Sequence, residues 1–429
     1  KENCSMAKVV KFFKTIRNNW KKSVFFAGVA VYGVQWSRKK YDESVLRTVY
    51  CAEAQKFGDA PLVLGDRPKR VTVFLNPAAK NGKCKKLFDK NVAPILHLAG
   101  FEVTLVRTEY EGQAKKYMDV VDQTDAIVVA GGDGTVLEVV TGLLRRADSE
   151  KWTDCSIGVI PLGHTNTLAQ TLFYKGESDV RWLLESALAV VYNRTKNVDV
   201  MAIKGSEDRT VYALSSLQWG PYRDADSKKR KYWYFAGLKE YWAYVRESMK
   251  SWPRQIEASF TYEKPCDGCS RCFSPPPEPV WRWWHFLLPP KREVIKFDYS
   301  KIDNPECGNT WDLRLDSTEF SCVTQNNLEI VEPPKHLKLE IGPKELSKSE
   351  FISNGWNRVK GKGGAEKNEH LQVQKFELLP EIPEGKEAWF SIDNEEFEAM
   401  PVEVSLLRDR VKVFCGLKLP ALAQEMPNL

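Results

Sequence analysis

The stretch AIVVAGGDGT, residues 126–135, gives the strongest indication of how this 429-residue chain folds. Its first five residues are apolar without a break, which is typical of a strand buried on both faces of a parallel sheet. Helical periodicity follows the glycines, with one apolar face formed by Val136, Val140, Leu143 and Leu144. The stretch therefore predicts a buried strand, a tight glycine turn and an amphipathic helix in direct succession.

Three glycines in this turn, Gly131, Gly132 and Gly134, have no Cβ atom, so backbone N–H groups can approach phosphate oxygens closely at the start of the helix. Asp133 lies among them. A carboxylate does not bind an anion, so beside a phosphate it would meet Mg²⁺ or accept a proton from an attacking hydroxyl. The alternative is a structural turn in which Asp133 caps the helix, and this stretch alone favours neither interpretation.

Apolar runs of similar length surround the stretch, at residues 71–75, 101–106 and 157–160, and the segments between them are long enough for crossover helices. This pattern predicts an α/β fold with a doubly wound parallel sheet, which we expect to form a nucleotide domain over residues 68–195.

After about residue 195 the sequence pattern becomes typical of β-strands, and we expect a mostly β, sandwich-like second domain over residues 196–420. Its predicted strands are 198–203, 210–219, 256–262, 389–392, 402–407 and 411–414. A proline-rich insertion at about 263–310 and a polar segment at 342–370 are expected to be loops.

Two further turns rich in glycine and asparagine follow predicted strands, NPAAKNGK at 76–83 and PLGHTNT at 161–167. Because ligand clefts in open α/β sheets lie at the carboxyl edge, the three turns together predict a nucleotide site there. The spacing fits neither a Walker A loop nor the GxGxxG dinucleotide fingerprint.

Composition and charge exclude several classes of protein. The net charge of +6 is modest for this length and does not predict a nucleic-acid binder. No run of apolar residues is long enough for a standard membrane span, which excludes a multi-pass transporter or channel. The chain contains no GxSxG and no HExxH motif, so a serine lipase or a zinc protease finds no support.

The N-terminal 60 residues are expected to form a separate targeting and membrane-associated segment. Nine basic residues and no acidic ones lie between Glu2 and Asp42, with aromatic and aliphatic residues at helical spacing among them. A 13-residue apolar run at 24–36 follows, which is short for a span. We predict mitochondrial targeting with membrane association through residues 8–40, the rivals being a secretory signal and a solvated basic tail.

The motifs NPxxxxGK, GGDGTxxEVxxG and PLGxxN, in this order, resemble the diacylglycerol kinase catalytic family, which includes sphingosine and ceramide kinases. The resemblance implies transfer of a phosphoryl group from ATP, with Mg²⁺, to the hydroxyl of a monoacylglycerol or diacylglycerol. The products would be lysophosphatidic and phosphatidic acid, and sphingosine or ceramide remains an alternative acceptor.

The resemblance also assigns roles to single residues. Asp133 would be the catalytic base, Glu138 would order the glycine loop, and Glu395 would support the metal or the chemistry. Nucleotide contacts would come from Asn76, Pro77, Gly82, Gly131, Gly132, Gly134, Thr135, Gly163 and Asn166. Asp224 resembles the position that meets the lipid head group in sphingosine kinases, the alternative being a surface turn carboxylate.

The chain departs from the family pattern at several positions of these motifs. His164 and Thr167 replace a threonine and an aspartate, and Asn394 replaces the glycine of an Asp-Gly-Glu motif. These changes leave Asp133 and its three glycines in place, so we expect catalysis to be retained.

Other segments, such as EGQAKK at 111–116 and FEAMPVEV at 397–404, are similar to a mitochondrial branch of the family that acts on acylglycerols. That similarity implies a location at the inner membrane or in the intermembrane space. It also implies a second role, as a binding subunit of the carrier translocase of the inner membrane, which need not use the phosphate turns.

Cys266, Cys269 and Cys272 form a CxxCxxC pattern inside the proline-rich insertion. They would ligate zinc if Cys307 or His285 came near. Because no second CxxC is present, we interpret the pattern as an incidental loop cluster and predict no metal site in the protein.

Overall fold

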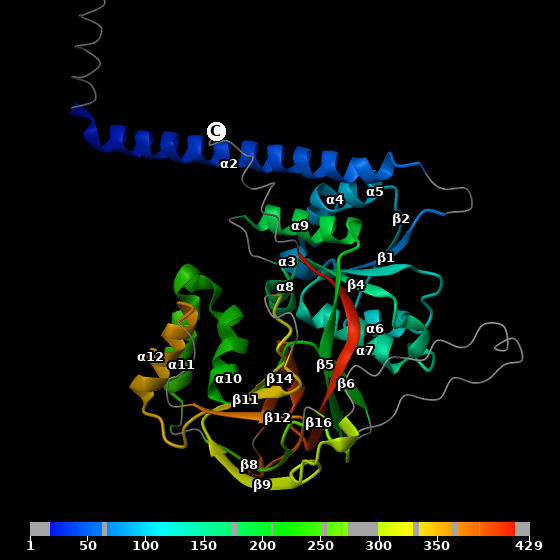
Figure 1. The fold of residues 1–429 in the computed structure, drawn as a ribbon. Helices are drawn as coiled ribbons and strands as arrows, with labels where there is room; N and C mark the ends of the chain where they lie inside the picture. The colour runs from blue at the N-terminus through cyan, green and yellow to red at the C-terminus, as the bar shows by residue number, and fades with distance from the viewer. Residues whose placement is uncertain are drawn as a thin grey trace, which may run out of the picture.

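Two β-sheets organise the protein (Figure 1). The structure, a computed structural model, describes residues 18–61, 67–173, 178–206, 209–250, 252, 255–266, 268–272, 299–328, 334–362, 368–385 and 387–416. The basic stretch before residue 18, the proline cluster of the insertion and His285 lie outside these ranges.

Four parallel strands form one half of the larger sheet, in the order β2-β1-β3-β4. They are β1 (Arg70–Leu75), β2 (Glu102–Arg107), β3 (Ala126–Gly131) and β4 (Ser156–Pro161). Every residue of β3 and β4 is buried, which is why both read as unbroken apolar runs. The doubly wound parallel sheet predicted from the sequence is confirmed.

Helices cover both faces of these strands (Figure 1). One face carries α4 (Cys84–Asn91), α5 (Ala93–Leu98) and α9 (Asp179–Val191). The other face carries α6 (Gln113–Tyr117) and α7 (Asp133–Arg145). Shorter helices occupy the connections, namely α3 (Ala79–Gly82), η1 (Ser149–Trp152) and α8 (Thr167–Leu172).

The larger sheet continues past β4 with β16, which runs parallel to it, and then with antiparallel pairs in the order β16-β13-β8-β9. β5 pairs with β16, and β6 pairs with β5. These strands are β5 (Thr195–Gly205), β6 (Thr210–Ala213), β8 (Ile256–Glu263), β9 (Thr310–Ser317), β13 (Lys375–Pro380) and β16 (Val402–Phe414). β16 combines the two strands predicted at 402–407 and 411–414, since only a bulge separates them. One continuous sheet therefore runs through the α/β part and the mostly β part.

The smaller sheet is antiparallel, in the order β12-β11-β10-β7-β14-β15. Its strands are β7 (Ser216–Trp219), β10 (Phe320–Val323), β11 (Leu337–Ile341), β12 (Glu369–Val373), β14 (Trp389–Ile392) and β15 (Glu395–Glu398). It packs face to face on the antiparallel half of the larger sheet, and rings such as Phe260, Phe320 and Phe376 fill the space between them. The mostly β second part predicted from the sequence is confirmed.

Two local predictions are wrong. Residues 210–219 form two strands of different sheets, because the buried Asp393 carboxylate accepts hydrogen bonds from the backbone N–H groups of residues 214–216 and breaks the strand there. Within the predicted loop 342–370 lies α12 (Lys348–Val359), which a capping box of Ser347 and Glu350 begins.

A helical cluster lies beside the smaller sheet (Figure 1). It consists of α10 (Pro221–Lys228), η2 (Lys229–Leu238), α11 (Lys239–Ser248) and α12, around a small core that includes Tyr222, Tyr244 and Phe351. A single turn, η4 (Tyr299–Lys301), follows the proline-rich part of the insertion.

The first described helix, α2 (Trp20–Gly58), docks only its C-terminal half on the body, against α5 and α9 (Figure 1). Apolar side chains of its other half face solvent; Phe25, Phe26 and Tyr32 are 67%, 68% and 70% exposed. In the described part of the chain no helix combines the length and the apolar character that crossing a bilayer requires.

Candidate active site

A cleft of about 460 Å³ lies where the carboxyl ends of β1, β3 and β4 face the hairpin formed by β14 and β15. Nine of the residues predicted for the site line it, namely Asn76, Pro77, Gly132, Asp133, Gly134, Thr135, Glu138, Gly163 and Glu395. The structure thus brings together the three glycine and asparagine turns and the carboxylate from the far end of the chain.

Two of the turns touch through their backbones. A Cβ atom on Gly163 would lie 2.1 Å from the Cα atom of Gly132, so neither position has room for a side chain. The backbone N–H of Asp133 donates to the carbonyl of Thr165 across the same contact, at 3.2 Å. This close packing fixes the start of α7 against the turn after β4.

Asp133 is buried, and its carboxylate points toward the start of α8. It accepts hydrogen bonds from the backbone N–H groups of Thr167 and Leu168, at 2.9 and 3.4 Å. Burial raises the pKa of Asp133, while these bonds oppose the rise. The side chain thus caps α8 and not, as the structural interpretation expected, α7; it also lines the cleft, and its catalytic role stays a prediction.

Asn394 provides a third hydrogen bond to Asp133. Its side-chain amide donates to Asp133 Oδ2 and to Thr167 Oγ1, each at 2.9 Å. Asp393 and Asn394 form a two-residue turn with φ of 47° and 67°, a left-handed conformation that asparagine and aspartate tolerate. Two departures from the family pattern, Thr167 and Asn394, thus contact each other and the predicted base.

Asp393 fixes this turn to the smaller sheet. Its fully buried carboxylate accepts hydrogen bonds from the N–H groups of Leu214, Ser215 and Ser216, at 2.7 to 2.8 Å. Burial, opposed by these bonds and aided by the charge of Asp133, raises the pKa of Asp393 to about 6.

Glu395 is half-buried and lines the cleft from the β14–β15 hairpin. A Cβ atom on Gly134 would lie 2.0 Å from Glu395 Oε1, so the carboxylate rests on the first turn of α7. Within the described ranges no donor forms a hydrogen bond or ion pair with it. Burial, together with the charges of Glu111, Glu138 and Asp133, raises the pKa of Glu395 to about 7.

Other predicted residues shape the turns. The Glu138 carboxylate accepts from the N–H groups of Gly112 and Ala114, at 2.8 and 3.2 Å, so it orders the loop after β2. Asn76 donates to Thr135 Oγ1 at 3.3 Å. Asn166 bonds both backbone groups of Gly163 and closes its own turn. Asn166, Gly82 and Gly131 are not among the residues that line the cleft.

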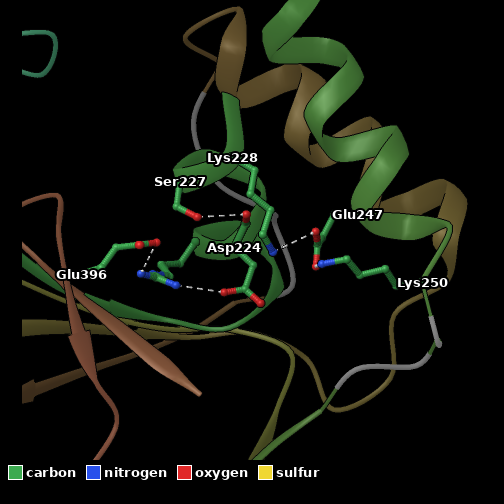
Figure 2. Close-up of polar contacts among 7 residues, drawn as sticks. Asp224, Ser227, Lys228, Glu247, Lys250 and Glu396 are labelled. Carbon is green, nitrogen blue, oxygen red and sulfur yellow. Dashed lines mark hydrogen bonds and ion pairs between the residues drawn. The ribbon is translucent and has the colours of Figure 1, made fainter. Parts of the chain in front are cut away.

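Asp224 lies outside this cleft, in a second cavity of about 400 Å³ beside Trp219 and Trp389. One buried side chain, Arg223, links residues of both cavities. Its guanidinium donates to Asp224 at 3.1 Å and to Glu396, which lines the cleft, at 2.8 Å (Figure 2). Asp224 is therefore part of an ion-pair network and not a lone surface carboxylate.

Several residues that line the cleft were not predicted from the sequence. The most consequential is Arg230 of η2, the one arginine or lysine that lines the cleft among the described residues. Burial, aided by the charge of Arg230, lowers the pKa of His164, and the same charge opposes the rise in the pKa of Glu395. The basic run KKRK at 228–231 was the signal that could have identified it. The loop 108–111 also lines the cleft, and no pattern in its sequence pointed to it.

Comparison with known proteins now decides the family. The profile of the diacylglycerol kinase catalytic domain matches residues 70–203, and that of the acylglycerol kinase C-terminal region matches residues 214–425. "Acylglycerol kinase, mitochondrial" from Pongo abelii is 42% identical over 410 residues, which cover 94% of this chain and 96% of its own. The human protein of the same name is 41% identical over 409 residues, with the same coverage.

The chain belongs to the acylglycerol kinase family. It is therefore a lipid kinase with a diacylglycerol kinase catalytic domain. The fold agrees, since the crystal structure of a diacylglycerol kinase from Bacillus anthracis superposes with a TM-score of 0.50 at 16% identity, over 82% of this chain and 98% of its own. The resemblance seen in the three turn motifs is confirmed.

Proposed function

We propose that this kinase transfers the γ-phosphate of ATP to the hydroxyl of monoacylglycerol and diacylglycerol, giving lysophosphatidic and phosphatidic acid. The observation that carries the proposal is the pair of carboxylates, Asp133 and Glu395, at the first turn of α7 within a cleft of glycine turns. Phosphoryl transfer needs phosphate binding, charge neutralisation and a proton acceptor, and this arrangement offers groups for each.

ATP phosphates would bind at the start of α7, where glycines leave backbone N–H groups accessible and the helix dipole favours negative charge. Arg230, which also lines the cleft, would contribute a guanidinium for the transferred group. The contact between Gly132 and Gly163 supports this assignment because it fixes two of the phosphate turns against each other.

Asp133 would accept the proton from the attacking lipid hydroxyl. Burial makes its carboxylate a stronger base than an exposed aspartate, and three hydrogen bonds hold it in one orientation. Asn394 and the backbone at the start of α8 would position the Asp133 carboxylate.

The residues present fit a magnesium ion. The carboxylate of Glu395 has no donor among the described residues and its pKa is raised by neighbouring negative charges, an environment that a divalent cation would relieve. Glu395 would hold Mg²⁺ beside the nucleotide phosphates. When bound, the ion would neutralise charge on the phosphate oxygens.

The lipid would approach from the side of η2. This segment carries Arg230 into the cleft and exposes aromatic side chains next to it, Trp233 by 77% and Tyr234 by 60%. Tryptophan and tyrosine favour the headgroup region of a bilayer, and neighbouring lysines favour anionic lipids. Asp224 would act on the acceptor indirectly, through Arg223 and Glu396.

We further propose that the protein works in mitochondria, at the inner membrane facing the intermembrane space. The relatives named above carry the word mitochondrial in their names. The exposed apolar half of α2, flanked by basic residues, supports attachment to a membrane surface.

A second role, as a binding subunit of the carrier translocase, is favoured by the same half of α2. No residue of α2 lines the cleft. The two roles are separable, because an inactive Asp133→Asn protein would keep α2.

The experiment that tests the proposal is phosphate transfer from labelled ATP and Mg²⁺ to a panel of lipids in vesicles. We expect labelled product with monoacylglycerol and diacylglycerol and none without lipid. Product with sphingosine or ceramide alone would replace the acylglycerol assignment. Absence of transfer to every acceptor, by folded protein that binds ATP, would contradict the kinase proposal and leave the translocase role.

A further inference from the structure

Four cysteines converge at the base of the insertion between β8 and β9. Three follow β8 in the CxxCxxC pattern and the fourth precedes β9, and we call them the cysteine cluster: Cys266, Cys269, Cys272 and Cys307. The fourth residue lies 35 positions beyond the third in the sequence. The incidental loop cluster expected from the sequence is therefore a spatial cluster, completed by one of the two candidates that could have joined it.

The distances between the sulfurs match a tetrahedral metal site. All four Sγ atoms lie within 4.8 Å of one another. Cys269 and Cys272 are separated by 3.6 Å, and Cys272 and Cys266 by 3.8 Å. Four thiolates about 2.3 Å from a tetrahedral zinc ion would lie roughly 3.8 Å apart, whereas a disulfide joins its sulfurs at about 2.05 Å.

Two hydrogen-bond donors, one from the backbone and one from a side chain, point at sulfurs of the cluster. The N–H of Cys269 donates to Cys272 Sγ and the side-chain amide of Asn304 donates to Cys266 Sγ, each at 3.3 Å. Such donors are the outer partners that orient metal ligands. Gly268, with φ of 131°, allows the chain to turn between the first two cysteines.

Further contacts hold the two ends of the insertion together. The N–H of Ser270 donates to the carbonyl of Ile302 at 2.8 Å, and Arg271 donates to the carbonyl of Pro305 at 3.1 Å. Residues on either side of the insertion, Glu263 and Thr310, pair in the sheet. The sheet thus brings the ends close, and the cluster lies where one ion would join them.

We propose that the cysteine cluster binds one structural zinc ion. Four thiolates favour a soft, tetrahedral cation, and a site with four protein ligands has no open position for substrate. An iron–sulfur cluster is a poorer fit, because its irons and sulfides separate the cysteines further. The ion would cross-link the ends of the insertion and stabilise the β8–β9 edge of the larger sheet.

The test is the metal content of the full chain, purified under reducing conditions without a histidine tag. We expect about one zinc ion per chain, by elemental mass spectrometry, for the unaltered protein. Cys269→Ser and Cys307→Ser should lose the zinc, while the control Cys51→Ser, which changes a half-buried thiol on α2, should retain it. Replacement by Co²⁺ should give the thiolate charge-transfer absorption and visible bands of a tetrahedral sulfur site.

A second measurement does not depend on the folding of variants. In the unaltered native protein, the cluster thiols should resist alkylation until a zinc chelator is added, and peptide mapping should then find the label on all four. Zinc-free protein that takes up no zinc, disulfides among these cysteines after purification under reducing conditions, or iron in place of zinc would each overturn the proposal.

Discussion

At the residue scale, the side chain that most distinguishes this site is Asn394. It occupies a left-handed turn position that a glycine would also fit, yet its amide bonds both Asp133 and Thr167. A neutral amide thus provides a donor to the carboxylate assigned as the base. The residue that departs from the family motif is, in the structure, a hydrogen-bond donor to this carboxylate.

Replacing Asn394 by glycine should lower kcat about 10-fold to 100-fold, because a hydrogen bond to a charged group contributes about 1.5–3 kcal/mol. Glycine keeps the turn, so the KM for ATP should change little. Loss of the donor raises the pKa of Asp133 further, so the acidic limb of the rate profile should move to higher pH. Steady-state kinetics across pH check this; an unchanged kcat and an unchanged profile would exclude the positioning role.

Glu395 should give the rate its own pH dependence. With its pKa raised to about 7, the carboxylate is largely protonated below neutrality and cannot hold a cation. We expect kcat/KM to fall as pH decreases from about 8 to about 6, with a midpoint near 7, and saturating Mg²⁺ should shift the midpoint downward. Glu395→Gln should lower the rate and remove this limb, whereas retention of the limb in the variant would assign it to another group.

At the scale of elements, the β14–β15 hairpin matters most, because it delivers Asn394 and Glu395 to the sheet edge and Asp393 holds it there. Asp393→Ala leaves three buried N–H groups without their acceptor and should reduce the free energy of unfolding by about 3–5 kcal/mol. Urea unfolding measures this change. A loss below about 1 kcal/mol would mean that the hairpin does not depend on this carboxylate.

The same residue predicts a pH dependence of stability. Its pKa is about 6 in the folded protein against 3.8 for the ordinary value, so the native state binds this proton more tightly than the unfolded chain. Its contribution to the free energy of unfolding should therefore decrease as pH rises from about 4 to about 6. The difference in the free energy of unfolding between the unaltered protein and Asp393→Asn, measured by urea unfolding across this pH range, should show this decrease directly.

The segment η2 predicts how the enzyme behaves on membranes. Trp233→Ser combined with Tyr234→Ser should raise the KM for acylglycerol in vesicles about tenfold, because two aromatic anchors at the bilayer surface are lost. Activity on a short-chain, dispersed acylglycerol should be unchanged. Leu313→Ser, at an exposed apolar position of β9, is the matched control; equal effects on both substrate forms would place η2 in the chemistry instead of membrane contact.

At the scale of the whole molecule, the parallel sheet and its three turns were predictable because strands buried on both faces read as apolar runs. The break at residues 214–216 was not, since it depends on Asp393 nearly 180 residues away. The place of Arg230 in the cleft and the approach of Cys307 to the other three cysteines likewise depend on the three-dimensional fold. The basic run at 228–231 and the CxxCxxC pattern marked these residues in the sequence, but only packing among distant segments brings them to their sites.

The site combines residues from segments far apart in the sequence. β16 pairs with the parallel strand β4, and the β14–β15 hairpin supplies Glu395 to the cleft formed by the turns after β1, β3 and β4. The most direct test of this account compares the unaltered protein with Asp133→Asn, using Asp119→Asn, at an exposed position away from the cleft lining, as control. We predict that Asp133→Asn binds Mg·ATP within about threefold of the unaltered protein by calorimetry but transfers phosphate to acylglycerol at least about 100-fold more slowly. Transfer by a folded Asp133→Asn protein at the rate of the control would contradict it.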